Sequence, residues 1–184
     1  MKSSLSFRLV SLLCFVLPAA LPAADYMASR TDTYTRVGGL LSFVMPAVAF
    51  GATAYMKDGE GAWQVTKSMA VTGVITLGFK YSVRSRRPNG DPYSFPSGHA
   101  AFAMASAQFL GQRYGWEYGV PAYVLAAFSA HSRVWAHEHY LKDVAAGTVI
   151  GIVSTYFFTT PYHGWHVRPE FSGGAGSLKL SRSF

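Results

Sequence analysis

Three basic residues and two histidines are spaced along the middle of the chain in a way that could bind and cleave a phosphate ester. The basic residues are Lys80, Arg87 and Arg133, and the histidines are His99 and His139. Fixed cations suit an anion of high charge density. Histidines can act as nucleophile, acid or base near neutral pH. The set therefore predicts a phosphate-ester hydrolase that works without a metal ion.

His99 stands in a sequence that is typical of a helix start. Pro96 and Ser97 suit the first positions of a helix, and Gly98 lets a ligand approach the backbone closely. Free N–H groups at such a helix N-terminus attract anions. We therefore expect Ser97 and Gly98 to bind the phosphate and His99 to protonate the leaving oxygen, then to activate water.

His139 and Asp143 are four residues apart, which would place them on one face of a helix. The carboxylate could then accept a hydrogen bond from one ring nitrogen and leave the other nitrogen free to attack. Most pairs with this spacing are simple surface pairs. Here Arg133 lies just before the pair in the sequence, which favours a catalytic role with His139 as the nucleophile.

The sequence offers little that could hold a metal ion. His137, Glu138 and His139 are consecutive, so on a helix their side chains would point in different directions. The nine acidic residues are scattered along the chain rather than clustered as in two-metal phosphatases. We expect neither a metal site nor a cofactor.

Five segments of helix length must position these residues. They are predicted over 37–56, 63–84, 96–114, 121–134 and 139–159. Short turns join most of them, including one predicted over Gly115–Gly119, and helices joined in this way run antiparallel. The sequence therefore predicts an all-α antiparallel bundle of about five core helices, with the active site at one end.

The N-terminus has the pattern of a secretory signal over residues 1–24. Lys2 and Arg8 precede an uncharged apolar run, Leu9–Leu21, and small residues cluster at its end, just before Asp25. An uncleaved anchor helix is the alternative. Cys14, the one cysteine, lies in this segment, so cleavage would leave a chain that cannot form an internal disulfide.

The remaining chain divides into a helical-bundle domain over 25–163 and a tail over 164–184. In the tail, Leu178, Leu180 and Phe184 alternate with polar residues, which indicates a short strand or an extended segment.

Composition favours a membrane or envelope protein over a nucleic-acid-binding one. Half of the 184 residues are apolar and 14% are charged, while the net charge is +7. The basic residues cluster over 80–87, beside the histidines, which favours a substrate role for part of the charge. The segments 37–56 and 144–162 lack charge and could span a bilayer. We expect an inner-membrane protein with its site facing the periplasm, or a soluble periplasmic one. The oligomeric state stays open.

Three linked motifs resemble those of the type-2 phosphatidic acid phosphatase superfamily, which includes bacterial acid phosphatases and vanadium haloperoxidases. The motifs are Lys80-x6-Arg87-Pro88, Pro96-Ser97-Gly98-His99 and Ser132-Arg133-x5-His139-x3-Asp143. They span about a third of the chain. The resemblance implies an all-α bundle and a metal-independent phosphomonoesterase with a phosphohistidine intermediate. It also implies His139 as nucleophile, Asp143 as its orienting residue and His99 as acid and base.

The implied phosphate site comprises five residues: Lys80, Arg87, Ser97, Gly98 and Arg133. The first functional hypothesis is hydrolysis of a phosphorylated lipid. A soluble periplasmic acid phosphatase acting on small phosphate esters is the second. A vanadate-dependent haloperoxidase, a metal-dependent hydrolase and a non-catalytic phosphate- or lipid-binding protein are further alternatives.

Overall fold

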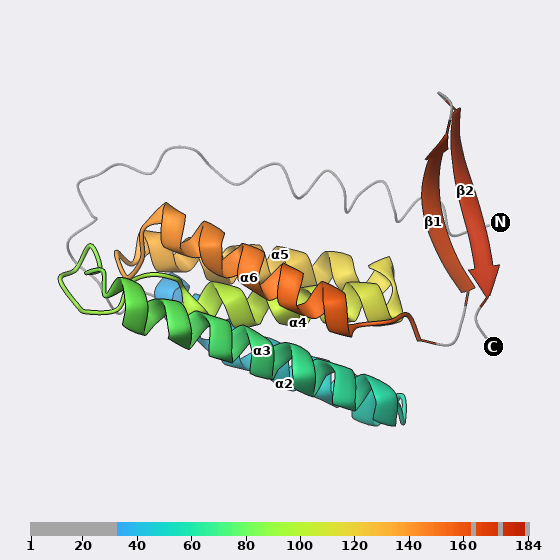
Figure 1. Cartoon of the computed structure of the whole chain (residues 1–184), viewed down its shortest axis with the longest axis horizontal. Helices are drawn as coiled ribbons and strands as arrows, with labels where there is room; N and C mark the ends of the chain where they lie inside the picture. The colour runs from blue at the N-terminus through green and yellow to red at the C-terminus, as the bar shows by residue number, and fades with distance from the viewer. Residues whose placement is uncertain (1–32, 163–164, 173–174, 183–184) are drawn as a thin grey trace. The chain divides into compact units, whose positions relative to one another are not determined.

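A computed structural model describes residues 33–162, 165–172 and 175–182, and within this part of the chain five helices form a bundle (Figure 1). The helices are α2 (Thr33–Tyr55), α3 (Gly59–Val83), α4 (Gly98–Tyr114), α5 (Trp116–Trp135) and α6 (Leu141–Phe158). The prediction of a helical bundle is confirmed. The predicted signal over 1–24 lies outside the described residues.

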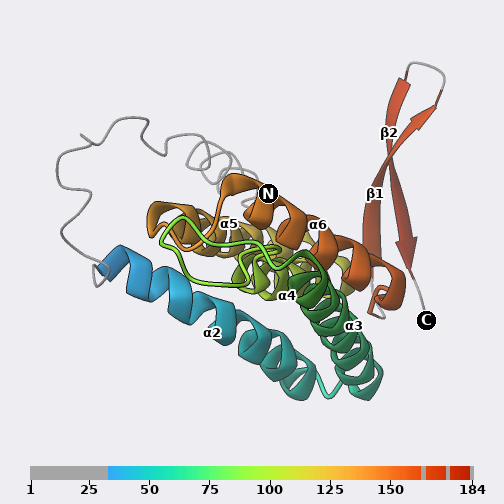
Figure 2. The ribbon, with the colours of Figure 1, turned by 60° about the vertical axis from the view of Figure 1, so that its left-hand side comes forward.

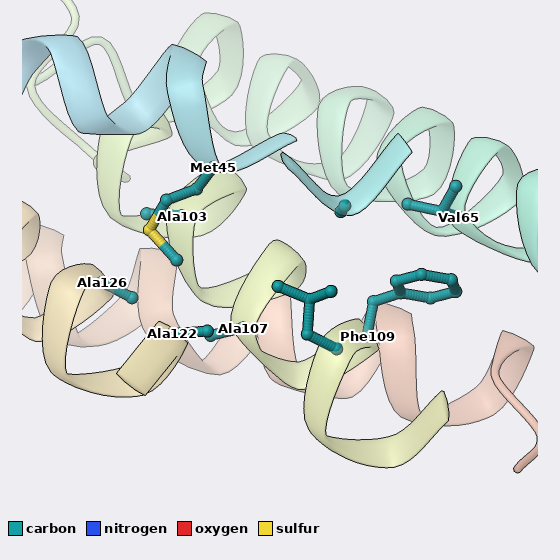
Figure 3. Packing of buried hydrophobic residues seen from close by; sticks show 9 residues of the cluster. Met45, Val65, Ala103, Ala107, Phe109, Ala122 and Ala126 are labelled. Atoms are coloured by element: carbon teal, nitrogen blue, oxygen red, sulfur yellow. The ribbon is translucent and has the colours of Figure 1, made fainter. Parts of the chain in front are cut away.

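Helix α4 lies at the centre of the bundle and packs against each of the other four helices. Its sequence is rich in alanine, which has the highest helix propensity and the smallest side chain after glycine. Ala103 and Ala107 are fully buried beside Met45 of α2 and Ala126 of α5 (Figure 3). Small side chains therefore let the helices approach closely around α4.

The connection between α4 and α5 is shorter than the sequence predicts. Gly115 alone reverses the chain, with a φ of 100° that glycine adopts without strain. Helix α5 consequently begins at Trp116, and the predicted turn over Gly115–Gly119 and helix start at Pro121 are wrong.

The start of α6 also differs from the prediction. His139 lies in the loop before the helix, because α6 begins at Leu141 and Tyr140 is its N-cap with an extended backbone. The Tyr140 N–H donates to the Asp143 carboxylate over 3.0 Å, which satisfies one backbone donor that the helix leaves unpaired. His139 and Asp143 therefore do not share a helix face.

The tail forms an antiparallel hairpin of β1 (Trp165–Ser172) and β2 (Ala175–Arg182), with Val167 opposite Leu180. The predicted extended segment is found in β2. The first strand was not predicted, because Pro169 lies within it and proline weakens a strand signal.

A buried ion pair closes the bundle at the end where α2 turns into α3. Two nitrogens of Arg113 donate to the two carboxylate oxygens of Asp58, each over 2.7 Å, and Tyr114 donates to the same carboxylate. Arg113 also donates to the Thr160 carbonyl after α6 over 2.8 Å. Burial opposes ionisation of Asp58, but the bonds from Arg113, Gly61 and Tyr114 hold its pKa below the ordinary value.

We expect Asp58→Ala to lower the free energy of unfolding by about 3–5 kcal/mol, because the Arg113 guanidinium would stay buried without its partner. Since the pKa of Asp58 is depressed in the folded protein, the stabilisation is present above its unfolded pKa. It is lost as the pH falls through the folded value. Denaturation of the purified protein in detergent at several pH values measures both effects.

The matched control is Glu117→Ala, at an exposed position in the first turn of α5. It should cost about 1 kcal/mol or less. Equal losses of unfolding free energy in the two variants would show that the Asp58–Arg113 pair stabilises the fold no more than an exposed residue does.

Candidate active site

The predicted site residues come from segments that meet at one end of the bundle. There α3 ends, α4 begins, α5 ends and α6 begins (Figure 1 and Figure 2). The loops over 84–97 and 136–140 complete this end. The short turns in the sequence predict that these helix ends lie together, and the fold places them at the same end of the bundle.

A cavity of about 450 Å³ lies at this end of the bundle. Five of the eight predicted site residues line it, namely Lys80, Arg87, Gly98, His99 and His139. The other lining residues are Ser42, Phe43, Pro46 and Phe102. Ser97, Arg133 and Asp143 are buried and are not part of the lining.

The apolar wall of the cavity comes largely from α2 and was missed by the sequence analysis. The ring of Phe43 meets the ring of His99 edge to face, with centroids 6.0 Å apart. Pro46 and Phe102 extend the wall. Nothing in the sequence of α2 pointed to this role, because an uncharged helical run reads only as a core helix or a membrane span.

His139 is almost fully buried and stands beside Asp143. Its Nδ1 lies 3.8 Å from the Asp143 carboxylate, which is longer than a hydrogen bond. The carboxylate instead accepts from the Ser94 hydroxyl and from the Tyr140 N–H. A movement of about 1 Å would bring the imidazole into hydrogen-bonding range. Ser94 was not singled out, since a lone serine in a loop carries no sequence signal.

The surroundings of His139 keep its imidazole neutral. Burial, together with the nearby Arg87 and Lys80, lowers the pKa of His139 to about 3. The ring is therefore neutral near neutral pH and keeps one unprotonated nitrogen, whose lone pair is available to attack.

Lys80 and Arg87 supply the charge on the cavity wall. Lys80 donates to the Tyr93 carbonyl over 2.8 Å, which fixes the ammonium at the end of α3. The Nε of Arg87 is buried and has no hydrogen-bond partner among the described residues. An oxyanion in the cavity would satisfy this donor.

Ser97 and Gly98 have different roles at the start of α4. Ser97 is the N-cap, and its hydroxyl accepts from the Ala100 N–H over 3.4 Å. Its own N–H donates to the Asp143 carbonyl over 2.9 Å. The serine thus anchors α4 to α6, and Gly98, not Ser97, reaches the cavity.

Arg133 lies buried in the last turn of α5 and does not line the cavity. Its guanidinium donates to Ser132 over 3.1 Å, to Glu138 over 3.0 Å and to the Thr35 carbonyl of α2. The N–H of His139 donates to the Arg133 carbonyl over 3.2 Å. Arg133 therefore connects α2, α5 and the loop that carries His139.

No three His, Cys, Asp or Glu side chains gather into a possible metal site in the part of the chain that the structure describes.

The chain is similar to known proteins in sequence and in fold. A family model described as the PAP2 superfamily matches residues 61–166, more than half of the chain. The lipid A 4'-phosphatase of Helicobacter pylori is 29% identical over 150 residues, which cover 74% of this chain and 75% of that protein. The lipid A 1-phosphatase of Porphyromonas gingivalis is 38% identical over 90 residues, which cover 46% of this chain and 20% of that protein.

The fold is similar to a solved structure as well. The crystal structure of LpxE from Aquifex aeolicus superposes with a TM-score of 0.57 at 21% sequence identity, covering 82% of this chain and 92% of that chain. The resemblance stated from the three motifs is thus confirmed, as is the helical fold that it implied.

We expect Arg87→Gln to raise the pKa of His139 above about 3, because one of the cations that disfavour the imidazolium is removed. Burial remains, so the pKa should stay below the ordinary value of 6.5. Titration of ¹⁵N-histidine-labelled protein by NMR measures the change. Arg36→Gln, at an exposed position on α2, is the matched control and should leave the titration unchanged. A wild-type His139 that titrates near 6.5 would contradict the prediction.

Proposed function

Because the chain belongs to the PAP2 superfamily and is a phosphoric monoester hydrolase, we propose that it removes phosphate from a phosphorylated lipid through a phosphohistidine intermediate. The observation that carries the proposal is the cavity that joins Lys80, Arg87, His99 and His139 to an apolar wall. The cations suit the phosphate, and the wall suits the apolar part of the same substrate.

The phosphate is bound by fixed charge and by the backbone. Lys80 and Arg87 line the cavity, and the Gly98 N–H lies at the N-terminus of α4. Arg133, with two of its five N–H groups beyond the three bonds described, adds a third cation. Phosphoryl transfer depends mainly on such positioning and on neutralising charge around the phosphorus.

The reaction proceeds in two steps. The ring nitrogen of His139 that faces away from Asp143 forms a bond to phosphorus while the bond from phosphorus to the lipid oxygen breaks. His99 donates a proton to that oxygen. Water then attacks the phosphohistidine, His99 accepts the proton from water, and the N–P bond breaks to release inorganic phosphate and neutral His139. Asp143 orients the imidazole and stabilises the positive charge that develops on it.

The substrate that we propose is a phosphate group on lipid A or a related glycolipid. Two similar proteins carry the names lipid A 4'-phosphatase and lipid A 1-phosphatase, so the class is shared while the position of the phosphate differs between them. The mixed character of the cavity fits a phosphate attached to a large amphiphile better than a small soluble ester.

We also propose that the bundle lies in the inner membrane with the site facing the periplasm. Helices α2 and α6 are long and apolar enough to cross a bilayer. Large apolar side chains are exposed on both, including Leu40 at 61%, Val149 at 58% and Phe157 at 75%. Exposed apolar surface of this extent is rare on soluble monomers and marks contact with lipid or protein.

We expect wild-type protein quenched in alkali during turnover of a ³²P-labelled lipid substrate to retain label, because a phosphohistidine survives base. His139→Ala should retain none and should lose at least about 10³-fold in kcat, since the nucleophile is absent. His131→Ala, on the exposed side of α5, is the matched control and should keep both label and turnover. Full activity of His139→Ala would overturn the mechanism.

We expect kcat/KM for lipid A in detergent micelles to exceed that for p-nitrophenyl phosphate by at least about tenfold, because the smaller ester makes no use of the apolar wall. EDTA should leave both activities unchanged and orthovanadate should inhibit both. A panel on the purified protein, with phosphatidic acid as a second lipid, measures this. A preference for the soluble ester would favour the acid-phosphatase alternative, and loss of activity in EDTA would indicate a metal hydrolase.

A further inference from the structure

Arg133 is seated against a helix that carries none of the predicted catalytic residues. One terminal nitrogen donates to the Thr35 carbonyl in the first turn of α2. One turn later, a Cβ at Gly39 would lie 3.3 Å from Nη1 and 3.4 Å from Nη2 of the same guanidinium. Because residue 39 has no side chain, the backbone of α2 can lie close to the guanidinium of Arg133.

The neighbouring glycine fixes the contact between α2 and α5. A Cβ at Gly38 would lie 1.9 Å from the Ser132 hydroxyl, so no side chain fits there. The Ser129 hydroxyl donates to the Gly38 carbonyl over 2.7 Å. The two helices are therefore held together at the turn that carries Arg133.

The guanidinium has little room to move away from Gly39. Ser132 binds its Nε and Glu138 binds its Nη1, while Thr35 binds Nη2. A displacement of a few tenths of an ångström would lengthen at least one of these bonds. The position of the remaining N–H groups, which an anion would use, is set by the same contacts.

We propose that Gly38 and Gly39 form a seat on α2 that positions Arg133 for the phosphate of the substrate, with Gly39 as a positioning residue. The inference rests on the proposed function, in which Arg133 binds phosphate. It assigns a role to α2, which lies before the residues that the family model matches.

If Gly39 positions Arg133, the substitution Gly39→Ala should affect stability and phosphate binding differently. Alanine in place of glycine favours a helix, so Gly39→Ala should leave the melting temperature equal to or above that of the wild type. The added Cβ should at the same time displace the guanidinium. Stability and phosphate binding then separate, which a purely structural role for Gly39 would not produce.

The test compares Gly39→Ala with Gly51→Ala in the same helix, where an added Cβ meets nothing within 4 Å. For Gly39→Ala we expect the KM for a phosphate ester and the inhibition constant of inorganic phosphate to rise about tenfold, with a smaller change in kcat. Gly51→Ala should keep wild-type kinetics. Unchanged constants in Gly39→Ala, or equal changes in both variants, would overturn the seat.

A second measurement asks whether Gly39 acts through Arg133. Inorganic phosphate should raise the melting temperature of the wild type, less so for Gly39→Ala and for Arg133→Ala. Adding Gly39→Ala to Arg133→Ala should reduce the shift no further, because the two changes remove the same interaction. A further reduction would overturn the coupling. A wild-type protein without phosphatase activity would instead refute the proposed function itself, which separates the two failures.

Discussion

The site depends on the close approach of α4 and α6, which two glycines permit. A Cβ at Gly147 would lie 2.3 Å from the Ser97 carbonyl oxygen, and one at Gly151 would lie 2.2 Å from that of Ala101. Without side chains at these positions the backbones touch, so the start of α4 comes within hydrogen-bonding distance of Asp143. His99 and His139 line one cavity because each lies at or just before one of these helix starts.

The same close packing accounts for the electrostatics of the site. Lys80 and Arg87 lie near the buried His139, and together with burial they keep its imidazole neutral. Cations held near each other repel, so their side chains must be fixed by other bonds. Lys80 is fixed by the Tyr93 carbonyl, and Arg133 by partners on α2, α5 and the following loop. In the proposed function, the phosphate would meet charge that is already in position, an arrangement by which enzymes stabilise phosphoryl transfer at low reorganisation cost.

The helix pattern and the motif spacing were enough to predict the bundle and the end at which the chemistry lies. Boundaries were less accurate, because single residues decide them. Gly115 completes a turn that was expected to need five residues, and the capping bond from Tyr140 to Asp143 excludes His139 from α6. The pairing of His139 with Asp143 was argued from a shared helix face, whereas in the structure a loop places them side by side.

By itself the sequence determined the types of chemical group and their order: cations that suit phosphate, histidines that can attack and transfer protons, and uncharged runs long enough to pair as helices. These features follow from local composition and spacing, which can be read directly from the sequence. Only the tertiary structure decided that Phe43 lines the cavity, that the Ser97 N–H bonds to the Asp143 carbonyl, and that Arg133 lies against Gly39. Such contacts join residues far apart in the chain, and they depend on how closely two helices approach, which no local pattern encodes.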